Sequence, residues 1–435
     1  MLEIINSKNR VQLGALLKRL ENRSVSLDAE LMNLVTAIVD DVRRRGDAAL
    51  VDYAAKYDGL VIESSDLRID PEVLARCAES ADARTLAALR ESIRRVREFH
   101  EHQREESWEV KSKDGVRLGQ RIVPIESAGL YVPGGTASYP SSVVMNAVPA
   151  QVAGVERLVV ATPPRTLSDN PAVAAALVEL GVTEVYAVGG AQAIAALAYG
   201  TETVPRVDKI TGPGNKYVAA AKKIVFGAVG IDSIAGPSEV VIIADKTARP
   251  DYIAADLLAQ AEHGEDASSI LMTTSQKLAQ SVAAEVVRQT ETLPRRAIVE
   301  RSLASYGAII VVQQVEEACA LVNEMAPEHL EIMTSDEEYV ANLIRHAGAI
   351  FLAATRLSPL ATTSPAPIMF CPRGVLPRYS SALGVYDFVK RISVLKYSAG
   401  EINETANMIA TLAHAEGLEA HARSVLMRLD TTEAA

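Results

Sequence analysis

The chain has few cysteines, and the three that it has are far apart. They are Cys77, Cys319 and Cys371 in a sequence of 435 residues. An odd number of widely spaced cysteines predicts neither a disulfide framework nor a zinc knuckle. This cysteine usage is typical of a protein in the reducing cytoplasm.

Long apolar runs and basic blocks are also absent from the sequence. No run approaches the roughly 18 apolar residues needed to span a bilayer, and the first residues lack the pattern of a secretion signal. The chain has 44 basic and 55 acidic residues, which gives a formal net charge of −11. This balance disfavours a nucleic-acid or anionic-membrane partner. We therefore expect a cytoplasmic protein that acts on a small molecule.

What the chain does have is apolar sequence in short runs. Hydrophobic residues make up 49% of it, enough for a large core in more than one structural unit. The pattern from about residue 13 to 104 is mostly helical, and an Asp-Gly pair at residues 114–115 predicts a hairpin between residues 108–111 and 116–118.

Beyond residue 126, short β-rich runs alternate with helical segments. The clearest predicted strands are residues 158–161, 184–188, 240–243, 269–272 and 308–312. Each is followed by a helical pattern long enough for a crossover connection. The sequence therefore predicts an α/β fold with two open, mostly parallel, Rossmann-like units, a helical N-terminal section and a helical C-terminal tail.

The predicted domain limits follow from these changes of pattern. We expect an N-terminal helical arm, a discontinuous first α/β domain that carries metal and catalytic residues, a second α/β domain that binds NAD, and a helical tail that reaches a partner subunit. The corresponding ranges are 1–25, 26–130 with 239–380, 131–238, and 381–435.

Glycine-rich turns supply the first candidate site. Val188-Gly189-Gly190-Ala191-Gln192 and Thr211-Gly212-Pro213-Gly214-Asn215 each lead from a strand into a helix, and Tyr131-Val132-Pro133-Gly134-Gly135 forms a third turn. Glycine lets the backbone approach a ligand, and a helix amino terminus offers N–H groups to phosphate. None of the three is a GxGxxG sequence, and each alone could be an ordinary tight turn. Together they favour a nucleotide site.

Two polar clusters supply candidate chemistry. Gln260 and His263 are one helical turn apart in a predicted helix over residues 251–263 and could grip one ion, or could simply form a polar helix end. Glu328 and His329 follow Pro327 and could act as general base and general acid, or could be plain surface residues.

Taken together, these stretches resemble the histidinol dehydrogenase family, and the similarity runs from about residue 28 to 421. The motifs that carry the resemblance, in family order, are residues 129–135, 189–194, 212–215, 235–239, 260–263, 326–329 and 416–421. The family oxidises an amino alcohol through an aldehyde to the acid, with two NAD and a bound zinc, in an intertwined homodimer. The resemblance therefore implies NAD and zinc as cofactors and a homodimer with shared active sites.

The resemblance also implies roles for individual residues. Gln260 and His263 match zinc ligands, as does His421, which would come from the partner subunit. Glu328 would activate water for the second oxidation, and His329 would take the alcohol proton. The other matches are Tyr131, Gln192 and Asn215 for NAD, and Ser238 and Glu416 for the substrate. Glu416 and His421 would be about 140° apart on a continuous helix, so a shared pocket would need an irregular tail.

One segment departs from the family pattern. Where the family carries a zinc-binding Asp and a substrate-contacting Asn-His, this chain has Thr362 and Ile368-Met369. Residues 353–377 contain no Asp, Glu or His at all, and Cys371, at a family position that is apolar, is the one strong potential ligand there. Loss of a carboxylate ligand should weaken zinc binding, and an apolar wall should disfavour histidinol.

These observations predict an NAD-dependent dehydrogenase of this family that acts on a CH–OH group. Because of the altered segment, we expect a changed substrate, a small polar primary alcohol oxidised through an aldehyde to the carboxylate. Two alternatives stay open: a genuine L-histidinol dehydrogenase of histidine biosynthesis with a rearranged loop, and a non-catalytic ligand-binding paralogue. Complementation of a histidine auxotroph would identify the first, and binding without NADH formation would identify the second.

Overall fold

The computed structural model of the chain describes residues 2–23, 28–113, 115–134, 139–234, 236–352 and 376–429. It divides into two units. The first comprises residues 1–103 and 126–388, and the second comprises residues 104–125 and 389–435. Among the described helices, none is both long enough and apolar enough to cross a membrane.

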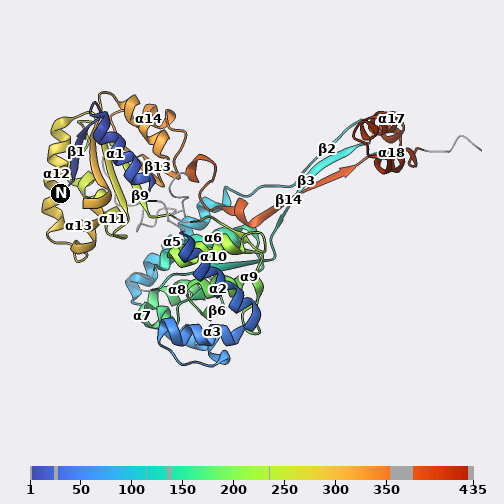
Figure 1. The fold of residues 1–435 in the computed structure, drawn as a ribbon, viewed down its shortest axis with the longest axis horizontal. Coiled ribbons are helices and arrows are strands. Elements are labelled where there is room, and N and C mark those ends of the chain that lie inside the picture. The colour runs from blue at the N-terminus through green and yellow to red at the C-terminus, as the bar shows by residue number, and fades with distance from the viewer. Residues whose placement is uncertain are drawn as a thin grey trace, which may run out of the picture. The chain divides into compact units, whose positions relative to one another are not determined.

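A six-stranded parallel sheet in the first unit has the strand order β1-β11-β10-β9-β12-β13. Figure 1 labels β1, β9 and β13 of this sheet. Its strands are β1 (Glu3–Asn6), β9 (Glu239–Ala244), β10 (Ser268–Thr273), β11 (Gly307–Val311), β12 (His329–Met333) and β13 (Ala349–Leu352). The central strands are almost wholly apolar and β-branched, as expected of strands that are buried on both faces.

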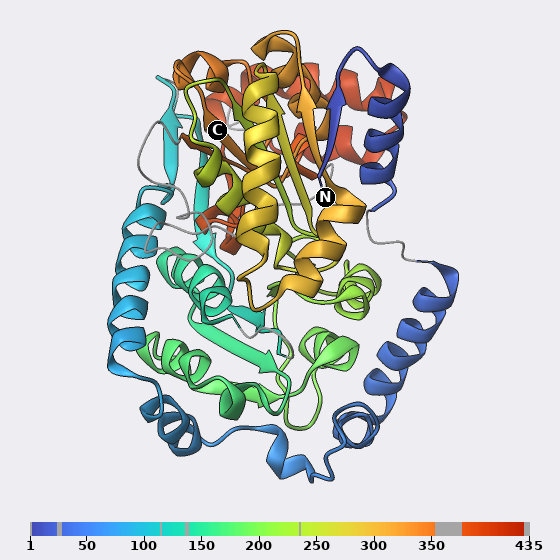
Figure 2. The same cartoon turned by 90° about the vertical axis from the view of Figure 1, so that its left-hand side faces the viewer.

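Helices cover both faces of this sheet. They are α1 (Arg10–Glu21), α11 (Pro250–Ala261), α12 (Gln276–Thr290), α13 (Arg296–Tyr306), α14 (Val315–Met325) and α15 (Glu337–Asn342). Helices α11, α12 and α13 form one hydrophobic core with the sheet, while α1, α14 and α15 form another on the opposite face. Figure 2 shows the yellow helices of the first group lying over the strands.

A five-stranded parallel sheet in the same unit has the order β6-β5-β4-β7-β8. Its strands are β4 (Ser127–Tyr131), β5 (Arg157–Thr162), β6 (Glu184–Ala187), β7 (Lys209–Thr211) and β8 (Gly230–Ile231). Its helices are α2 (Ala29–Arg45), α3 (Asp47–Tyr53), α4 (Pro71–Glu79), α5 (Ala83–Glu101), α6 (Pro140–Ala153), α7 (Thr166–Asp169), α8 (Pro171–Glu179), α9 (Gly190–Tyr199) and α10 (Lys216–Val225). Helix α2 packs on α9 and α10, and α5 packs on α6.

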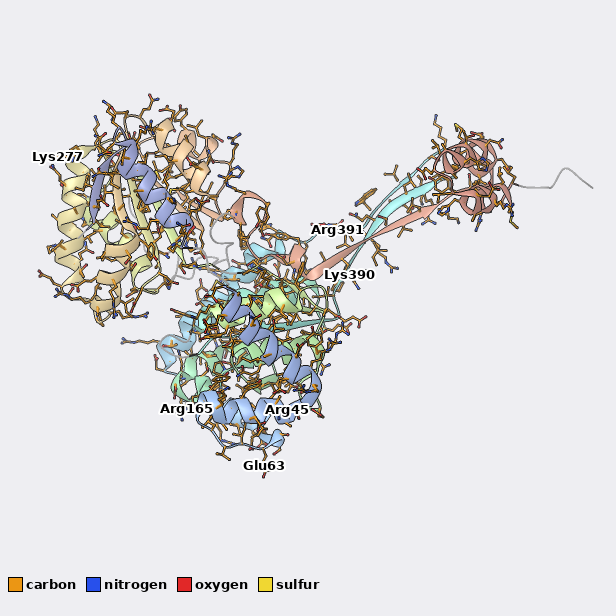
Figure 3. The ribbon with its side chains drawn as sticks, in the orientation of Figure 1. Arg45, Glu63, Arg165, Lys277, Lys390 and Arg391 are labelled. Carbon is orange, nitrogen blue, oxygen red and sulfur yellow. The ribbon has the colours of Figure 1, made fainter. Side chains whose placement is uncertain are left out.

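The second unit is an antiparallel sheet followed by two helices. Strand β3 (Arg117–Pro124) pairs with β2 (Trp108–Lys111) and with β14 (Val389–Lys396), and the chain continues into α17 (Ala399–Ala415) and α18 (Glu419–Leu426). Arg391, labelled on β14 in Figure 3, forms an ion pair with Glu105 that joins the two segments of this unit.

The predicted α/β class with mostly parallel sheets is confirmed, and all five predicted strands and the hairpin are present. The structure differs from the predicted domain description in three places. Residues 3–6 are a strand at the edge of the six-stranded sheet, residues 28–101 pack against the five-stranded sheet, and residues 389–396 are a strand where a helical tail was expected. Each difference arises from contacts between residues far apart in the chain, either strand pairing or helix packing, which local sequence pattern does not encode.

Candidate active site

The carboxyl edge of the five-stranded sheet gathers the three predicted NAD residues. Tyr131 is the last residue of β4, Gln192 is in the first turn of α9, and Asn215 directly precedes α10, which follows β7. Strands β4 and β7 are neighbours at the point where the strand order reverses. In open α/β sheets, ligands bind outside the carboxyl ends of strands at such a switch point.

Tyr131 holds one of the glycine-rich turns in place. Its buried hydroxyl oxygen accepts a hydrogen bond of 3.0 Å from the backbone N–H of Gly190, the first residue of α9. Gly190 has a φ of +68°, which a residue with a side chain rarely adopts. Burial raises the pKa of Tyr131 to about 12, so the hydroxyl is neutral at physiological pH. Gln192 lies two residues further on, and its side chain is buried.

Asn215 caps α10 and orders the second turn. Its side-chain oxygen accepts hydrogen bonds from the backbone N–H groups of Tyr217 at 3.0 Å and Val218 at 3.2 Å. The same turn passes very close to β4, because a Cβ added at Gly212 would lie 2.2 Å from the backbone oxygen of Tyr131. Only glycine fits there, and its φ is +113°.

A buried ion pair binds both the backbone N–H and the backbone carbonyl of Gly212. The Gly212 N–H donates to Asp232 at 2.8 Å, and the Lys222 ammonium donates to the Gly212 carbonyl at 2.5 Å and to Asp232 at 2.6 Å. The Lys222 and Asp232 side chains are only 2% and 3% exposed. Sequence reasoning missed this pair, because nothing local marks two charges on a helix and a following loop as partners.

These features fit NAD. Two helix amino termini and two glycines with positive φ lie at one sheet edge, where backbone N–H groups can approach phosphate oxygens closely. The amide group of Asn215 adds a donor beyond the oxygen that caps the helix.

The amino edge of the six-stranded sheet gathers the predicted catalytic residues. Ser238 directly precedes β9, Glu328 directly precedes β12, and His329 is the first residue of β12. Strands β9 and β12 are neighbours, with His329 opposite Val240, and the strand order reverses between them. The sheet thus brings Ser238, Glu328 and His329 to one edge.

Glu328 is buried and enters this edge through a strained backbone. The preceding helix ends at Ala326, which has a left-handed φ of 51°, and Pro327 restricts the next step of the chain. Glu328 is 2% exposed, and its carboxylate accepts a hydrogen bond of 3.1 Å from the Glu239 N–H. The ring of His329 packs edge-on against Phe351, with centroids 5.8 Å apart.

The predicted zinc ligands Gln260 and His263 lie at the carboxyl end of α11. The Gln260 side chain is buried, and its amide nitrogen has no hydrogen-bond partner among the described residues. The His263 backbone N–H donates to the Gln260 carbonyl at 3.2 Å, which fixes the turn between them. A helix carboxyl end carries partial negative charge, which favours a cation. An oxygen and an imidazole here fit zinc as two of its ligands.

These two ligands do not complete a metal site by themselves. The part of the chain that the structure describes contains no group of three His, Cys, Asp or Glu residues placed to hold a metal ion. The remaining predicted residues of this region, Thr362, Ile368, Met369 and Cys371, lie outside the described residues.

Glu416 and His421 belong to the second unit. Helix α17 ends at Ala415, Gly417 has a φ of +74°, and His421 lies in α18. Both side chains are exposed. The chain is therefore irregular between Glu416 and His421, as a pocket shared by these two predicted residues would need.

The chain shares its sequence and its fold with known proteins. The family model for histidinol dehydrogenase matches residues 21–429. The histidinol dehydrogenase of Geobacillus kaustophilus is 52% identical over 405 residues, covering 93% of this chain and 95% of that protein. The Bacillus subtilis protein of the same name is 50% identical over 407 residues, covering 93% and 95%.

Structural similarity agrees. The crystal structure of histidinol dehydrogenase from Elizabethkingia anophelis matches with a TM-score of 0.91 and 33% identity, covering 98% of each chain. About half of all aligned positions are identical to those of two histidinol dehydrogenases, and a solved structure of a third matches nearly the whole chain. The chain belongs to the histidinol dehydrogenase family.

Proposed function

We propose that this protein is an L-histidinol dehydrogenase that uses NAD and zinc in histidine biosynthesis. The observation that carries the proposal is that about half of all residues are identical to histidinol dehydrogenases over more than nine tenths of their length. The retained Gln260, His263, Glu328 and His329 support it, since they lie at one end of the six-stranded sheet and its helices.

The sequence-based expectation of a changed substrate gains no support from these comparisons, which favour the alternative of a genuine histidinol dehydrogenase. That expectation rested on the segment 353–377 alone. A protein that had adopted another alcohol would be expected to differ at Ser238 as well, because this residue would contact the substrate. Ser238 is retained.

The three departures in this segment share one feature of the genetic code. Codons that begin with A and continue with C or T encode Thr, Ile or Met. If the reading frame moves one base upstream, the same two bases become the second and third positions of codons for Asp, Asn, His or Tyr. Thr362, Ile368 and Met369 stand where the family has Asp, Asn and His. In the same frame Cys371 becomes Leu, which agrees with an apolar family position.

We infer that two compensating one-base shifts bracket this segment, and that the neighbouring frame encodes the zinc-binding Asp and the Asn-His pair. The test compares the unaltered chain with a restored chain that carries Thr362→Asp, Ile368→Asn and Met369→His. The restored chain should retain zinc and oxidise histidinol, and the unaltered chain should do both weakly. A gene whose codons for this segment do not give Asp, Asn and His in the neighbouring frame would contradict the inference. Equal zinc content and turnover in the two chains would show that these three residues are not needed for either, and would make Cys371→Ser the next variant.

The residues at the two sheet edges divide the reaction between them. Zinc held by Gln260 and His263 would supply Lewis-acid polarisation of the substrate oxygen, and NAD would accept the hydride. His329 takes the proton of the alcohol. Glu328 takes a proton from the water that adds to the aldehyde, so that the second oxidation yields the carboxylate. Tyr131 keeps the turn at Gly190 in the geometry that receives the cofactor.

A second copy of the chain would complete each active site. The second unit exposes large apolar side chains on its strands and helices, among them Leu395, Met408 and Leu412, the last with 66% of its surface accessible. Apolar patches of this kind favour a protein partner. A homodimer would cover them and would bring Glu416 and His421 to the site of the other chain.

Mixing two inactive variants tests this arrangement. Gln260→Ala and His421→Ala should each lose zinc-dependent turnover. If His421 crosses to the other subunit, co-refolded mixtures should regain about a quarter of the activity, since half of the dimers are mixed and each holds one intact site. No recovery would place both ligands in sites formed by a single chain.

Complementation tests the function itself. The restored chain should support growth of a strain that lacks histidinol dehydrogenase on medium without histidine, the unaltered chain should support slower growth, and the restored chain with Glu328→Gln should support none. Binding of histidinol and NAD without growth or NADH formation would instead favour the ligand-binding paralogue.

A further inference from the structure

Arg23 is a buried cation at the amino edge of the six-stranded sheet, two residues beyond the end of α1. Its side chain is 2% exposed. The guanidinium donates to the backbone oxygen of Ser238 at 3.1 Å and of Asp266 at 2.8 Å, and it forms an ion pair with Glu239. Its guanidinium carbon also lies 5.6 Å from the ring centroid of Tyr306. A side chain held by this many contacts is fixed, and it fixes the groups that it binds.

Glu239 connects Arg23 to Glu328 through hydrogen bonds. The two residues lie opposite each other on β9 and just before β12, and each carboxylate accepts a hydrogen bond from the backbone N–H of the other. The Glu239 N–H donates to Glu328 at 3.1 Å, and the Glu328 N–H donates to Glu239 at 3.3 Å. This exchange sets the position of the Glu328 carboxylate relative to the sheet edge.

Charge makes the arrangement dependent on Arg23. The carboxylates of Glu239 and Glu328 are each bound to the backbone N–H of the other residue, and a buried negative charge is costly unless a cation lies beside it. The guanidinium of Arg23 supplies that cation for Glu239. Arg23 therefore holds Glu239 where its carboxylate and its N–H fix Glu328, the proposed acceptor of a proton from water.

We propose that Arg23 and Glu239 are positioning residues for Glu328, and that they serve the oxidation of the aldehyde rather than that of the alcohol. This inference rests on the proposed function, in which Glu328 takes a proton from water as the water oxygen bonds to the aldehyde carbon. NAD, when bound, would accept the hydride of the resulting hydrate. His329, which takes the alcohol proton, is the next residue along the chain after Glu328, and its ring packs against Phe351.

The experiment separates the two oxidations. Histidinol and the corresponding aldehyde are supplied separately to the zinc-loaded restored chain. The rate and the yield of NADH are measured with each substrate. Glu239→Gln, which keeps an oxygen for the Glu328 N–H, and Arg23→Met should lower aldehyde oxidation about a hundredfold and the first hydride transfer from histidinol far less. NADH formed per histidinol should fall from two toward one. Arg23→Lys should recover part of the loss.

Arg157→Met is the matched control. Arg157 pairs with Glu184 on the surface of the five-stranded sheet, with 47% of its side chain exposed, and its loss should leave both oxidations unchanged. Equal losses in both oxidations, or no loss, would overturn the inference. If Arg23→Met does not fold, the same comparison of the two oxidations is made with Glu239→Gln and Arg23→Lys. Absence of NADH from both substrates in the restored chain would instead refute the proposed function.

Discussion

The two parallel sheets of the first unit carry their candidate residues at opposite ends of their strands. In the five-stranded sheet, Tyr131 and Asn215 lie at the carboxyl edge, where helices α9 and α10 begin. In the six-stranded sheet, Ser238 and Glu328 lie at the amino edge, where α11 ends near Gln260.

This difference matches the charges of the two cofactors. Helix amino termini present N–H groups and partial positive charge, which suit the phosphates of NAD. The carboxyl end of a helix presents carbonyl groups and partial negative charge, which suit a zinc ion. Two sheets of similar architecture can therefore bind oppositely charged ligands when one sheet uses its carboxyl edge and the other uses its amino edge.

If the two edges are separate in function, a change at the amino edge should spare NAD. Glu328→Gln removes the proposed base while it keeps the size of the side chain. We expect aldehyde oxidation to fall about 10²- to 10⁴-fold, and NADH per histidinol to fall from two to one. Titration with NAD should give an unchanged Kd, and a weaker Kd would show that the two edges are coupled.

A change at the carboxyl edge should have the converse effect. Lys222→Met leaves Asp232 buried without its cation, and we expect the free energy of unfolding in urea to fall by about 3–5 kcal/mol. The Kd for NAD should rise, because Gly212 loses a donor, while zinc content stays the same. Lys209→Met is the control with a smaller expected loss, because Lys209 lies on β7 of the same sheet and its pair with Asp387 is partly exposed. Equal losses of unfolding free energy in Lys222→Met and Lys209→Met would refute a special role for the buried pair of Lys222 and Asp232.

Tyr131 allows a finer test of the carboxyl edge. Tyr131→Phe leaves the Gly190 N–H without its acceptor, which should cost about 1–3 kcal/mol of unfolding free energy at pH 8 and weaken NAD binding. Burial raises the pKa of Tyr131 to about 12 from an ordinary value of 10.0.

The sign of the pH effect follows from that shift. The folded protein retains the phenol proton at pH values where the unfolded chain releases it, so this stabilisation is complete below pH 10 and is lost as the pH rises toward 12. The stability difference between wild type and Tyr131→Phe should therefore shrink between pH 8 and pH 11. A constant difference would show that the phenol does not titrate with folding.

The smallest expected effect is on stability, and it concerns the left-handed backbone of Ala326 just before the amino edge. Ala326→Gly should relieve the left-handed backbone and raise the free energy of unfolding by up to about 1 kcal/mol, whereas Ala326→Val should lower it. Thermal melting of the pair of variants measures both changes. A melting temperature that falls for Gly and not for Val would mean that buried packing, and not backbone strain, dominates at Ala326.

The central strands could be predicted from the sequence because strands buried on both faces are continuous apolar runs, as in Val240-Val241-Ile242-Ile243. The candidate residues were found where they form short motifs, such as Glu328-His329. Arg23 and Glu239 were not recognised as partners because 216 residues separate them. The prediction of a changed substrate rested on Thr362 and its neighbours, which differ from the family, and the similarity of the whole chain to histidinol dehydrogenases gives it no support.

The yield of the reaction is the most direct test of the proposed two-step oxidation. Zinc-loaded restored chain is given limiting histidinol and excess NAD, and NADH and histidine are quantified together. Each histidinol consumed should give two NADH and one histidine. No NADH from a protein that binds both zinc and NAD would refute the proposed function.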